Sequence, residues 1–445
     1  MSNRIKVIGG GLSGCEAALQ LADAGVDVEL WEMRPKVQTP AHKTAGFAEL
    51  VCSNSFKGLG FTSAHGLFKE ELRRAGSRLI PIAMESRVPA GESLAIDRQA
   101  FSDAVEKALV SNPRITLRRE EATDLDPEAW TLVATGPLSS DALAKALFGL
   151  IGEQRLYFFD SIAPVVELDS VDREHVFAKN RWEKGHAEGQ EPDFLNCPLD
   201  KDTYFAFVEA LARADTVEPK PFEKGQLFEG CLPVEEMARR GKETLRYGPM
   251  RPVGLRHPET GKTPFAVIQL RAENRQRTLY NLVGFQTRLK WGTQKDIFSM
   301  VPALRNAVYA RFGAMHRNTF LNSPKVLEPS LRLKGTRIFC AGQITGAEGY
   351  TEAIGTGLYA ASQMLAALRD KTLVWPETTC LGALTRHLTD PNPDFQPMNF
   401  NFGLLPKMDT ETKLAKKDKK GAQVEQCLAT WEAFRPFPGR SLPPR

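Results

Sequence analysis

The feature that most constrains this chain is the glycine-rich segment that opens it. Ile5, Val7 and Ile8 form a short apolar run typical of a buried strand, and residues 9–14 then match the G-x-G-x-x-G spacing. Apolar residues at helical spacing lead to Gly25 as a C-terminal cap, and residues 26–31 read as a second strand. This order predicts a dinucleotide-binding βαβ unit, with a tight glycine turn that binds nothing as the alternative. The residues expected at the pyrophosphate are Gly9, Gly10, Gly11, Leu12, Ser13 and Gly14.

An acidic residue completes this unit. Glu32 ends the second predicted strand and lies 18 residues after Gly14. A carboxylate at this distance can accept hydrogen bonds from both hydroxyls of a ribose. We therefore expect Glu32 to bind the ribose next to the pyrophosphate.

Length, charge and cysteine content limit the classes of protein to which this chain can belong. The 445 residues suggest two or three domains, and a net charge of +4 announces no strongly charged partner. Seven cysteines without a C-x-x-C pair, and seven histidines without H-E-x-x-H, argue against a disulfide framework and against a metal site. No stretch approaches 18 uncharged apolar residues and no signal peptide is visible, so we expect a cytoplasmic protein with no membrane partner.

The nucleotide-binding pattern breaks off and returns late in the chain. Residues 35–65 form a long polar loop of the kind that is usually functional, and residues 132–136 read as a buried strand ending in Thr-Gly. Clean alternation of strand and helix is lost from about residue 150 to 325, then resumes with a strand at 336–341, a glycine turn at 342–346 and a helix at 353–368. We therefore expect an α/β nucleotide-binding domain of residues 1–150 and 326–445, with helices from about 371 packed on it. An inserted α+β domain of residues 151–325 interrupts it.

The returning segment favours FAD over NAD, which stays the alternative. A helix beginning at Ala353 would direct its positive end toward the first βαβ unit, which suits the electron-rich edge of a reduced flavin. Gly355 and Gly357 would permit the close approach of a bulky ring, with packing of the helix on its glycines for steric reasons alone as the alternative. The further residues expected to bind the cofactor are Arg34, Gly136, Gly342, Gln343 and Gly355.

Three cysteines lie in contexts that favour reactivity. Cys52 lies in the polar loop, and Cys231 precedes a predicted helix over 234–240 that has Pro233 near its first position. A helix N-terminus stabilises a thiolate, which is the nucleophilic form of cysteine. Cys197 is a third candidate, whereas Cys15 and Cys340 are expected in the core and Cys380 and Cys427 have no supporting context. Inert cysteines remain the alternative for each.

Several segments together resemble one family, TrmFO, the folate- and FAD-dependent tRNA (uracil-5-)-methyltransferases. The glycine motif is general to flavoproteins, but the other segments are specific and run along the whole chain. The matching residues are 9–14, 52–55, 196–199, 230–235, 248–255, 315–319 and 341–350. The resemblance implies a Rossmann-type FAD-binding domain of the glutathione-reductase or GidA-like kind, interrupted by the inserted domain.

The resemblance also implies a reaction. A one-carbon unit from 5,10-methylenetetrahydrofolate would pass by way of reduced FAD to C5 of uridine 54 in the T-loop of tRNA, with NAD(P)H as reductant. A thiolate adding at C6 makes C5 nucleophilic, and a base must later remove the C5 proton. Our hypothesis assigns Cys231 as nucleophile and Cys52 as base or second thiol. Glu348 and Tyr350 are candidates for the face shared by flavin and folate.

Contacts with tRNA are indicated by two basic segments, which could also be solvated surfaces. Trp291, a candidate for base stacking, lies among the residues of the first segment, which are Arg271, Arg275, Arg277, Arg288, Lys290 and Lys295. The second segment contains Lys413, Lys416, Lys417, Lys419 and Lys420. The rival functions are modification of an anticodon uridine, as in the related MnmG (GidA) family, oxidation of a small molecule by FAD, and a flavin-bound RNA-binding protein without catalysis.

Overall fold

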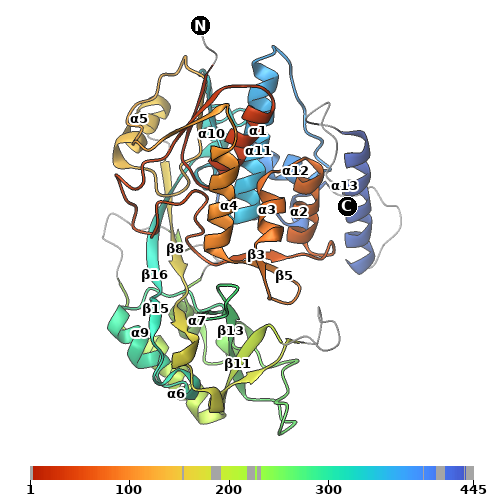
Figure 1. Cartoon of the computed structure of the whole chain (residues 1–445). Coiled ribbons are helices and arrows are strands. Elements are labelled where there is room, and N and C mark those ends of the chain that lie inside the picture. Colours follow the sequence, from red (N-terminus) through yellow and green to blue (C-terminus); the bar gives the residue numbers. More distant parts are fainter. Residues whose placement is uncertain are drawn as a thin grey trace.

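The structure, a computed structural model, describes residues 4–152, 155–181, 192–217, 226–227, 232–393, 395–406, 416–434 and 436. Two parts are visible in Figure 1, one above the other. The long antiparallel pair of β8 (Arg155–Ile162) and β16 (Ala314–Leu321) runs between them. The chain therefore leaves the upper part through one strand and returns through its partner.

A parallel sheet forms the centre of the upper part. Its strand order is β17-β7-β1-β2-β6, and all neighbouring strands are parallel. Its members are β1 (Ile5–Ile8), β2 (Val28–Trp31), β6 (Ile115–Arg118), β7 (Thr131–Val133) and β17 (Ile338–Cys340). β17 comes from the distant end of the chain, and it completes the nucleotide-binding sheet by pairing with β7 in parallel.

The second strand begins two residues later than the sequence predicts. The N–H of Val26 donates to the carbonyl of Leu21, and that of Gly25 donates to Ala22. These two bonds close the end of the first helix in the manner of a Schellman motif, so Val26 belongs to the helix cap. The strand therefore starts only at Val28.

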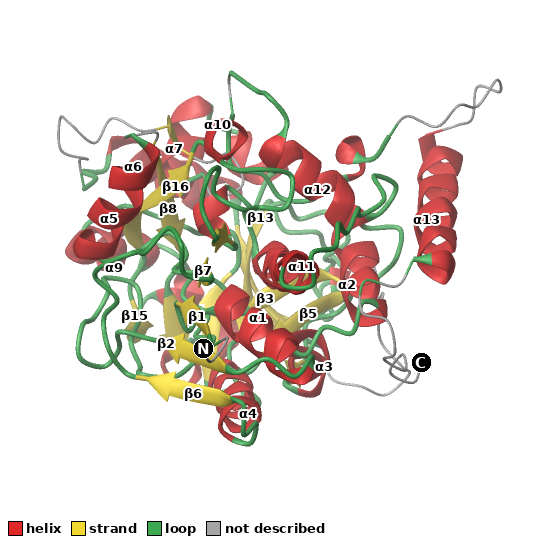
Figure 2. Ribbon diagram, turned by 90° about the horizontal axis from the view of Figure 1, so that it is seen from above, coloured by secondary structure: helices red, strands yellow, loops and turns green. Residues whose placement is uncertain are grey.

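Helices α1 (Leu12–Asp23), α4 (Arg98–Val110) and α11 (Tyr350–Ala367) pack against the parallel sheet. The other helices of the upper part are α2 (Ala64–Arg74), α3 (Leu79–Glu85), α5 (Asp141–Ile151), α10 (Ser323–Val326), α12 (Cys380–Thr389) and α13 (Lys416–Ala433). Figure 2 looks down α11 beside α1, with α13 at the edge of the molecule. A small antiparallel sheet of β3 (Ser55–Gly58), β5 (Ser93–Ile96) and β4 (Arg87–Val88) lies toward the lower part.

An antiparallel sheet of six strands dominates the lower part. Its strand order is β10-β11-β13-β14-β9-β15. The strands are β9 (Val165–Glu167), β10 (Phe177–Ala178), β11 (Phe194–Leu199), β13 (Ala266–Ala272), β14 (Leu279–Leu282) and β15 (Tyr309–Arg311). The short β12 (Gln226–Leu227) pairs with β8. The helices are α6 (Lys201–Arg213), α7 (Val234–Arg240), α8 (Thr244–Tyr247) and α9 (Trp291–Phe298).

Buried apolar residues gather mainly in two clusters. The larger draws on the chain from Ile5 to Phe148 and again from Phe320 to Trp431, and the second extends from Val166 to Ala307. The domain boundaries near residues 150 and 325 stay a prediction, because packing in two clusters does not by itself define independently folding units. Among the described helices, none combines the length and the apolar character needed to cross a membrane.

Candidate functional site

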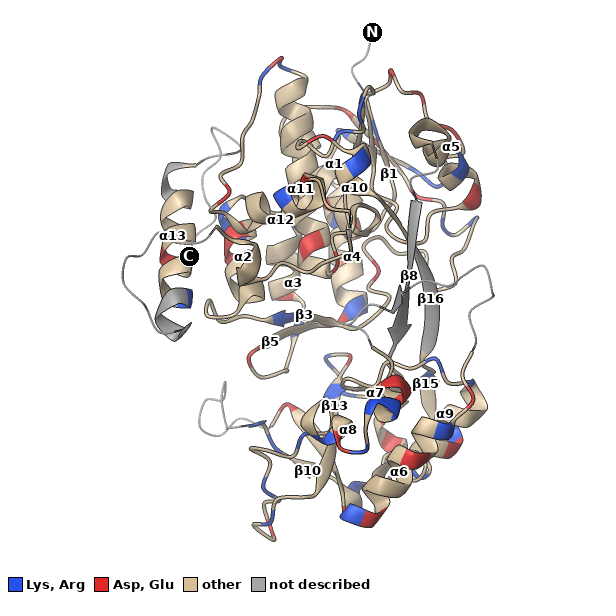
Figure 3. Cartoon of the chain, turned by 180° about the vertical axis from the view of Figure 1, so that it is seen from behind, with Lys and Arg blue, Asp and Glu red and all other residues tan. Residues whose placement is uncertain are grey.

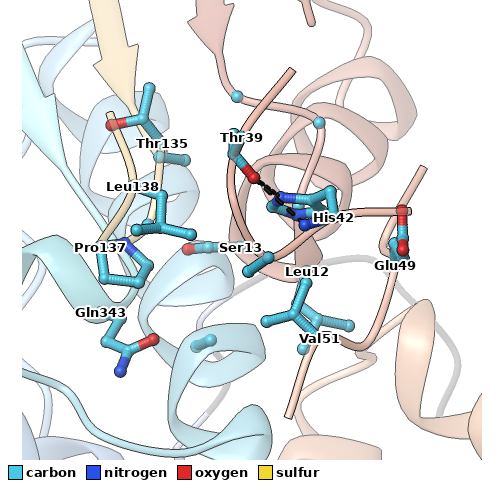
Figure 4. Close-up of a pocket in the computed structure, with 18 of the residues that line it drawn as sticks. Leu12, Ser13, Thr39, His42, Glu49, Val51, Thr135, Pro137, Leu138 and Gln343 are labelled. Carbon is cyan, nitrogen blue, oxygen red and sulfur yellow. Dashed lines mark hydrogen bonds between the residues drawn. The ribbon is translucent and has the colours of Figure 1, made fainter. Parts of the chain in front are cut away.

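A long cleft lies at the carboxyl ends of β1, β2 and β7, where open α/β sheets bind their ligands. Figure 4 shows Leu12 and Ser13 at the start of α1, with Thr39, His42, Glu49 and Val51 of the polar loop on one side and Thr135, Pro137, Leu138 and Gln343 on the other. Segments more than 300 residues apart in sequence therefore share one cavity. All residues of the opening glycine motif except Gly14 line it, as do Glu32, Arg34, Gly136, Gly342 and Gln343.

The glycines form a cradle that side chains would fill. Gly9 has φ +110°, and a Cβ there would lie 2.5 Å from the carbonyl oxygen of Ala134. A Cβ on Gly14 would lie only 1.9 Å from the carbonyl oxygen of Gly9, whereas a Cβ on Gly11 would meet no atom within 4 Å. Gly14 therefore allows α1 to approach β1, and Gly11 leaves open space at the helix N-terminus.

The start of α1 also carries an unused polar atom. The hydroxyl of Ser13 is buried and has no hydrogen-bond partner among the described residues. The first N–H groups of a helix are likewise free of intrahelical partners, and they carry partial positive charge. An anionic group such as a pyrophosphate fits this cradle, so the residues present suit the dinucleotide that the sequence predicts.

Glu32 is held as a carboxylate at the edge of the cradle. Its Oε2 accepts from the N–H of Gly10 at 2.8 Å, and its Oε1 accepts from the N–H and Nε of Arg34 at 3.0 and 2.8 Å. Burial opposes ionisation, but the hydrogen bonds and charge of Arg34 outweigh burial and lower the pKa of Glu32. A carboxylate offers about four acceptor positions, so room for a ribose hydroxyl remains after these three bonds.

Arg34 links Glu32 to the polar loop. Its guanidinium also donates to Oε2 of Glu49 at 2.9 Å, and the side chain is almost fully buried. Arg34 is expected from the sequence to bind the cofactor. Its donors are engaged by two carboxylates that line the cleft, so at least part of its role is structural. The sequence alone gave no signal for Glu49.

The returning segment reaches the cleft through its turn and the beginning of α11. Gly342 has φ +82°, and its N–H donates to the hydroxyl of Thr356 at 2.9 Å. The amide of Gln343 donates to Glu348 at 2.5 Å. α11 begins at Tyr350, three residues before the predicted start, so Tyr350 and Gly349 line the cleft at the helix N-terminus.

The expectation for Gly355 and Gly357 requires correction. Neither glycine lines the cleft. A Cβ on Gly355 would lie 2.8 Å from the ring of Phe68, and one on Gly357 would lie 2.3 Å from the carbonyl oxygen of Ser13. Both glycines therefore serve protein packing, and the second lets α11 approach α1.

Cys52 lies where the cleft meets the lower part of the molecule. Its N–H donates to the hydroxyl of Tyr350 at 2.9 Å, and that hydroxyl donates to the carbonyl of Ser53 at 2.9 Å. Guanidinium groups of Arg98 and Arg311 donate to the carbonyl of Cys52 at 3.0 and 3.1 Å. The side chain is partly exposed and lines the cleft. Three hydrogen bonds thus hold the backbone of Cys52 and a fourth holds that of Ser53, while the thiol of Cys52 stays accessible.

Burial separates the other cysteines from Cys52. Cys15, Cys197 and Cys340 are fully buried, and burial raises the pKa of each thiol, that of Cys340 to about 12. These thiols remain protonated at neutral pH, which removes Cys197 from the reactive candidates. Cys231 lies outside the described residues. The helix expected after it is present as α7, with Pro233 as its N-cap.

Cys380 and Cys427, for which the sequence offered no context, lie together. Their sulfur atoms are 3.7 Å apart, and they form with Glu71 a buried group of metal-ligand type. The carboxylate of Glu71 accepts from the N–H groups of Cys380 and Leu381 at 2.6 and 2.7 Å. Those bonds cap the N-terminus of α12, which gives the carboxylate a structural role.

Some basic side chains of the segment around Trp291 are buried, whereas others are exposed. Arg271 was expected at the RNA-facing surface, but it is only 8% exposed, and its Nη2 donates to Asn54 at 3.0 Å. Arg288 is paired with Glu235 and Glu236. Trp291 and Lys295 of α9 and Lys290 at its N-cap are exposed, and Figure 3 shows both signs of charge on the neighbouring helices. Of the second segment, only the side chain of Lys420 is described, and it is exposed.

Comparison with known proteins agrees with this architecture. Residues 4–372 match the model of a family described as glucose inhibited division protein A. A methylenetetrahydrofolate–tRNA-(uracil-5-)-methyltransferase TrmFO of Pelobacter propionicus is 52% identical, covering 97% of this chain and 94% of that protein. The protein of the same name from Geobacter sulfurreducens is 51% identical, covering 96% and 98%.

Solved structures agree on the fold. GidA of Aquifex aeolicus, in its form II crystal, is similar with a TM-score of 0.68 and 15% identity, covering 97% of this chain and 73% of that one. Together with the family match, this likeness confirms the GidA-like FAD-binding Rossmann α/β fold expected from the sequence.

Proposed function

The chain belongs to the TrmFO family, and we propose on that premise that it transfers a one-carbon unit from 5,10-methylenetetrahydrofolate to C5 of a uracil in tRNA, giving 5-methyluridine. The observation that carries the proposal is the accessible thiol of Cys52 at the rim of a cleft suited to a dinucleotide. A thiol at such a place can act on a pyrimidine ring. Simple oxidation of a small molecule by a flavin requires no such thiol. The target we propose is uridine 54 of the T-loop.

FAD is the cofactor that the cleft would hold, and when bound it supplies the electrons that turn the transferred carbon into a methyl group. The α1 N-terminus with Ser13 would bind its pyrophosphate, and Glu32 would accept a ribose hydroxyl. Gly342 lies beside Ser13, whereas Tyr350 contacts the backbone of Cys52, and we propose that the ring system and the folate lie between Gln343 and Tyr350. NAD(P)H is the reductant we propose.

Two thiols would share the work on the uracil. We assign Cys231 as the nucleophile that adds to C6 and Cys52 as the group that removes the proton from C5. The three hydrogen bonds that fix the backbone of Cys52, together with the one that fixes Ser53, support a role that needs a defined position. The target uridine must leave the T-loop stack to reach these thiols. Substrates of this kind suggest that the protein acts in the cytoplasm.

We further propose that α9 contacts the tRNA. Trp291 is 67% exposed and stacks on Phe312, with ring centroids 5.7 Å apart and 13° between the ring planes. Lys295 is exposed on the same helix, and Lys290 is exposed at its N-cap. An exposed aromatic side chain between lysines suits stacking on a base together with phosphate contacts.

A substrate-omission assay tests the function. The purified protein with FAD is incubated with NADPH, methylenetetrahydrofolate and tRNA lacking T-loop methylation, and nucleosides are analysed by mass spectrometry. We expect 5-methyluridine at position 54 only when the folate is present. Methylation that requires S-adenosylmethionine, product at an anticodon uridine, or absence of any methylated nucleoside would each overturn the proposal.

A further inference from the structure

A second, smaller cavity adjoins the Cys52 loop. Residues from both parts of the molecule line it, among them Cys52, Ser53, Ala163, Arg271, Asn281 and Gln286. Cys52, Ser53 and Gln286 also line the long cleft, so the two spaces meet at Cys52. A group bound in the smaller cavity would therefore lie beside the thiol.

Two buried donors in this cavity lack partners. Arg271 in β13 and Asn281 in β14 are directly opposite each other in the antiparallel register, and both are buried. Within the described part of the chain, neither Nε of Arg271 nor Nδ2 of Asn281 has a hydrogen-bond partner. Buried donors are almost always satisfied in folded proteins, so two unsatisfied donors on adjacent strands point to a ligand with oxygen acceptors.

The charge around the cavity has the sign that such a ligand needs. Arg98, Arg271 and Arg311 gather about one carboxylate in the described chain, that of Glu273, which pairs with Nε of Arg98 at 2.6 Å. Burial opposes ionisation of Glu273, but the charge and hydrogen bond of Arg98 outweigh it and lower its pKa, so the carboxylate is ionised. An excess of positive charge remains and favours a ligand that carries or develops negative charge.

We propose that this cavity binds the target uracil, with Arg271 and Asn281 donating hydrogen bonds to its ring carbonyl oxygens. The inference rests on the proposed function. The pterin of folate also carries a ring carbonyl, but the neighbouring thiol is a group that acts on the pyrimidine, which favours uracil.

The donors would act during the covalent step. A thiolate forms a bond to C6, and the electron pair of the C5–C6 double bond moves toward C5 and O4 as an enolate. Guanidinium and amide donors aimed at O4 stabilise this charge where it develops, as in an oxyanion hole. The charge on O4 is withdrawn when C5 forms its bond to the one-carbon unit, and it develops again when a base takes the C5 proton. After the transferred carbon has been reduced to a methyl group, the enolate re-forms the C5–C6 double bond and the thiolate leaves with the electron pair of the C6–S bond.

The test combines a variant with an altered substrate. Arg271→Met and Asn281→Leu, each as the FAD-loaded protein, are assayed with T-arm RNA carrying uridine or 4-thiouridine at the target position. With uridine we expect kcat to fall about 100-fold for Arg271→Met and about 10-fold for Asn281→Leu. Arg246→Met is the matched control, since Arg246 donates to the carbonyl of Phe265 and lines neither cavity.

The sulfur substitution separates binding of the base from support of the fold. If Arg271 binds O4, 4-thiouridine lowers the wild-type rate but lowers the rate of Arg271→Met much less. Equal fold-losses in both proteins would overturn the proposal, as would a rise in KM for methylenetetrahydrofolate with tRNA kinetics unchanged, which assigns the cavity to the folate. Failure of the wild-type protein to methylate uridine would instead overturn the proposed function.

Discussion

The two sides of the site are built from different parts of the protein. On the cleft side, backbone groups dominate: the glycines of the β1–α1 turn and the N-terminus of α1. On the side of the smaller cavity, side chains dominate, with three guanidinium groups around Glu273. A backbone cradle needs few side chains but tolerates no added atom where it is closely packed, as at Gly9 and Gly14, whereas a buried charge cluster depends on every partner. Cys52 lies between the two, and substitutions can test each side separately.

The largest effect is expected at Gly14. A Cβ there would lie 1.9 Å from the carbonyl of Gly9, so Gly14→Ala must displace α1 from β1. We expect a loss of about 3 kcal/mol in the free energy of unfolding, together with loss of FAD binding. Denaturant unfolding and flavin absorbance of the purified protein measure both.

Gly11→Ala is the matched control, because a Cβ at this position meets no atom within 4 Å. We expect the stability of the FAD-free protein to remain within about 0.5 kcal/mol of wild type, since no contact is disturbed, while FAD binding weakens. A Gly14→Ala protein as stable as Gly11→Ala would contradict the cradle described above.

On the side-chain face, Arg98 should matter most. Arg98→Met leaves the carboxylate of Glu273 buried without its closest partner, at a cost of about 2 to 3 kcal/mol. It also removes a donor to the carbonyl of Cys52, so methylation should fall at least as strongly as stability. Urea unfolding and methylation rates are the measurements.

The double variant Arg98→Met with Glu273→Gln separates these effects. Removing the charge of Glu273 should restore most of the lost stability while leaving activity low, because the Cys52 loop still lacks its anchor. Recovery of activity along with stability would argue that Arg98 merely balances charge.

A buried cation in the upper part of the molecule, Lys69 of α2, gives a pH-dependent test. Lys69 donates to the carbonyls of Phe56 and His65 at 2.7 and 2.9 Å, and burial lowers its pKa to about 8, although Glu352 partly offsets this. Below about pH 8 both the folded and unfolded states carry the proton, and burial of the charge destabilises the fold. Between about 8 and 10.5 only the unfolded state keeps it, so stability rises with pH.

Lys69→Met removes this titration. Relative to the variant, the wild-type free energy of unfolding should increase by about 2 kcal/mol from pH 8 to 10.5. Parallel stability curves for the two proteins over this range would show that the Lys69 ammonium is not disfavoured by burial.

The smallest effect is expected on the outer surface of the lower part. Trp291→Ala removes an exposed ring, so stability should change little, while KM for tRNA rises about fivefold if the ring stacks on a base. Tyr247→Ala is the control, because Tyr247 is 74% exposed on α8 in the same part of the molecule. Equal changes in KM for both variants would remove α9 from the RNA contact surface.

These two sides also differ in how far the sequence predicts them. The order of β1, glycines, α1, β2 and Glu32 follows from local spacing, because neighbours in sequence form the cradle. The end of the first helix shows the limit of prediction from local spacing. Val26 was expected to begin the second strand, but it caps the first helix. The GidA-like fold was predicted through family resemblance rather than through periodicity alone.

The side-chain cluster could not be predicted in the same way. Arg98 and Glu273 gave no signal, and Arg271 was expected at a surface, yet tertiary packing brings them together beside Cys52. The expectation that Gly355 makes room for the cofactor ring failed for a related reason. A glycine that accommodates the ring of Phe68 looks the same in the sequence as one that accommodates a ligand. Long-range packing, not local pattern, decides such positions.

The central claim is that thiols at the junction of these two sides act on one uracil. T-arm RNA with 5-fluorouridine at the target position blocks removal of the C5 proton, so the covalent adduct accumulates and mass spectrometry of digested peptides locates it. We predict the adduct on Cys231 in the wild-type protein and in Cys52→Ala, and none in Cys231→Ala. An adduct that persists in Cys231→Ala and disappears in Cys52→Ala would contradict this assignment.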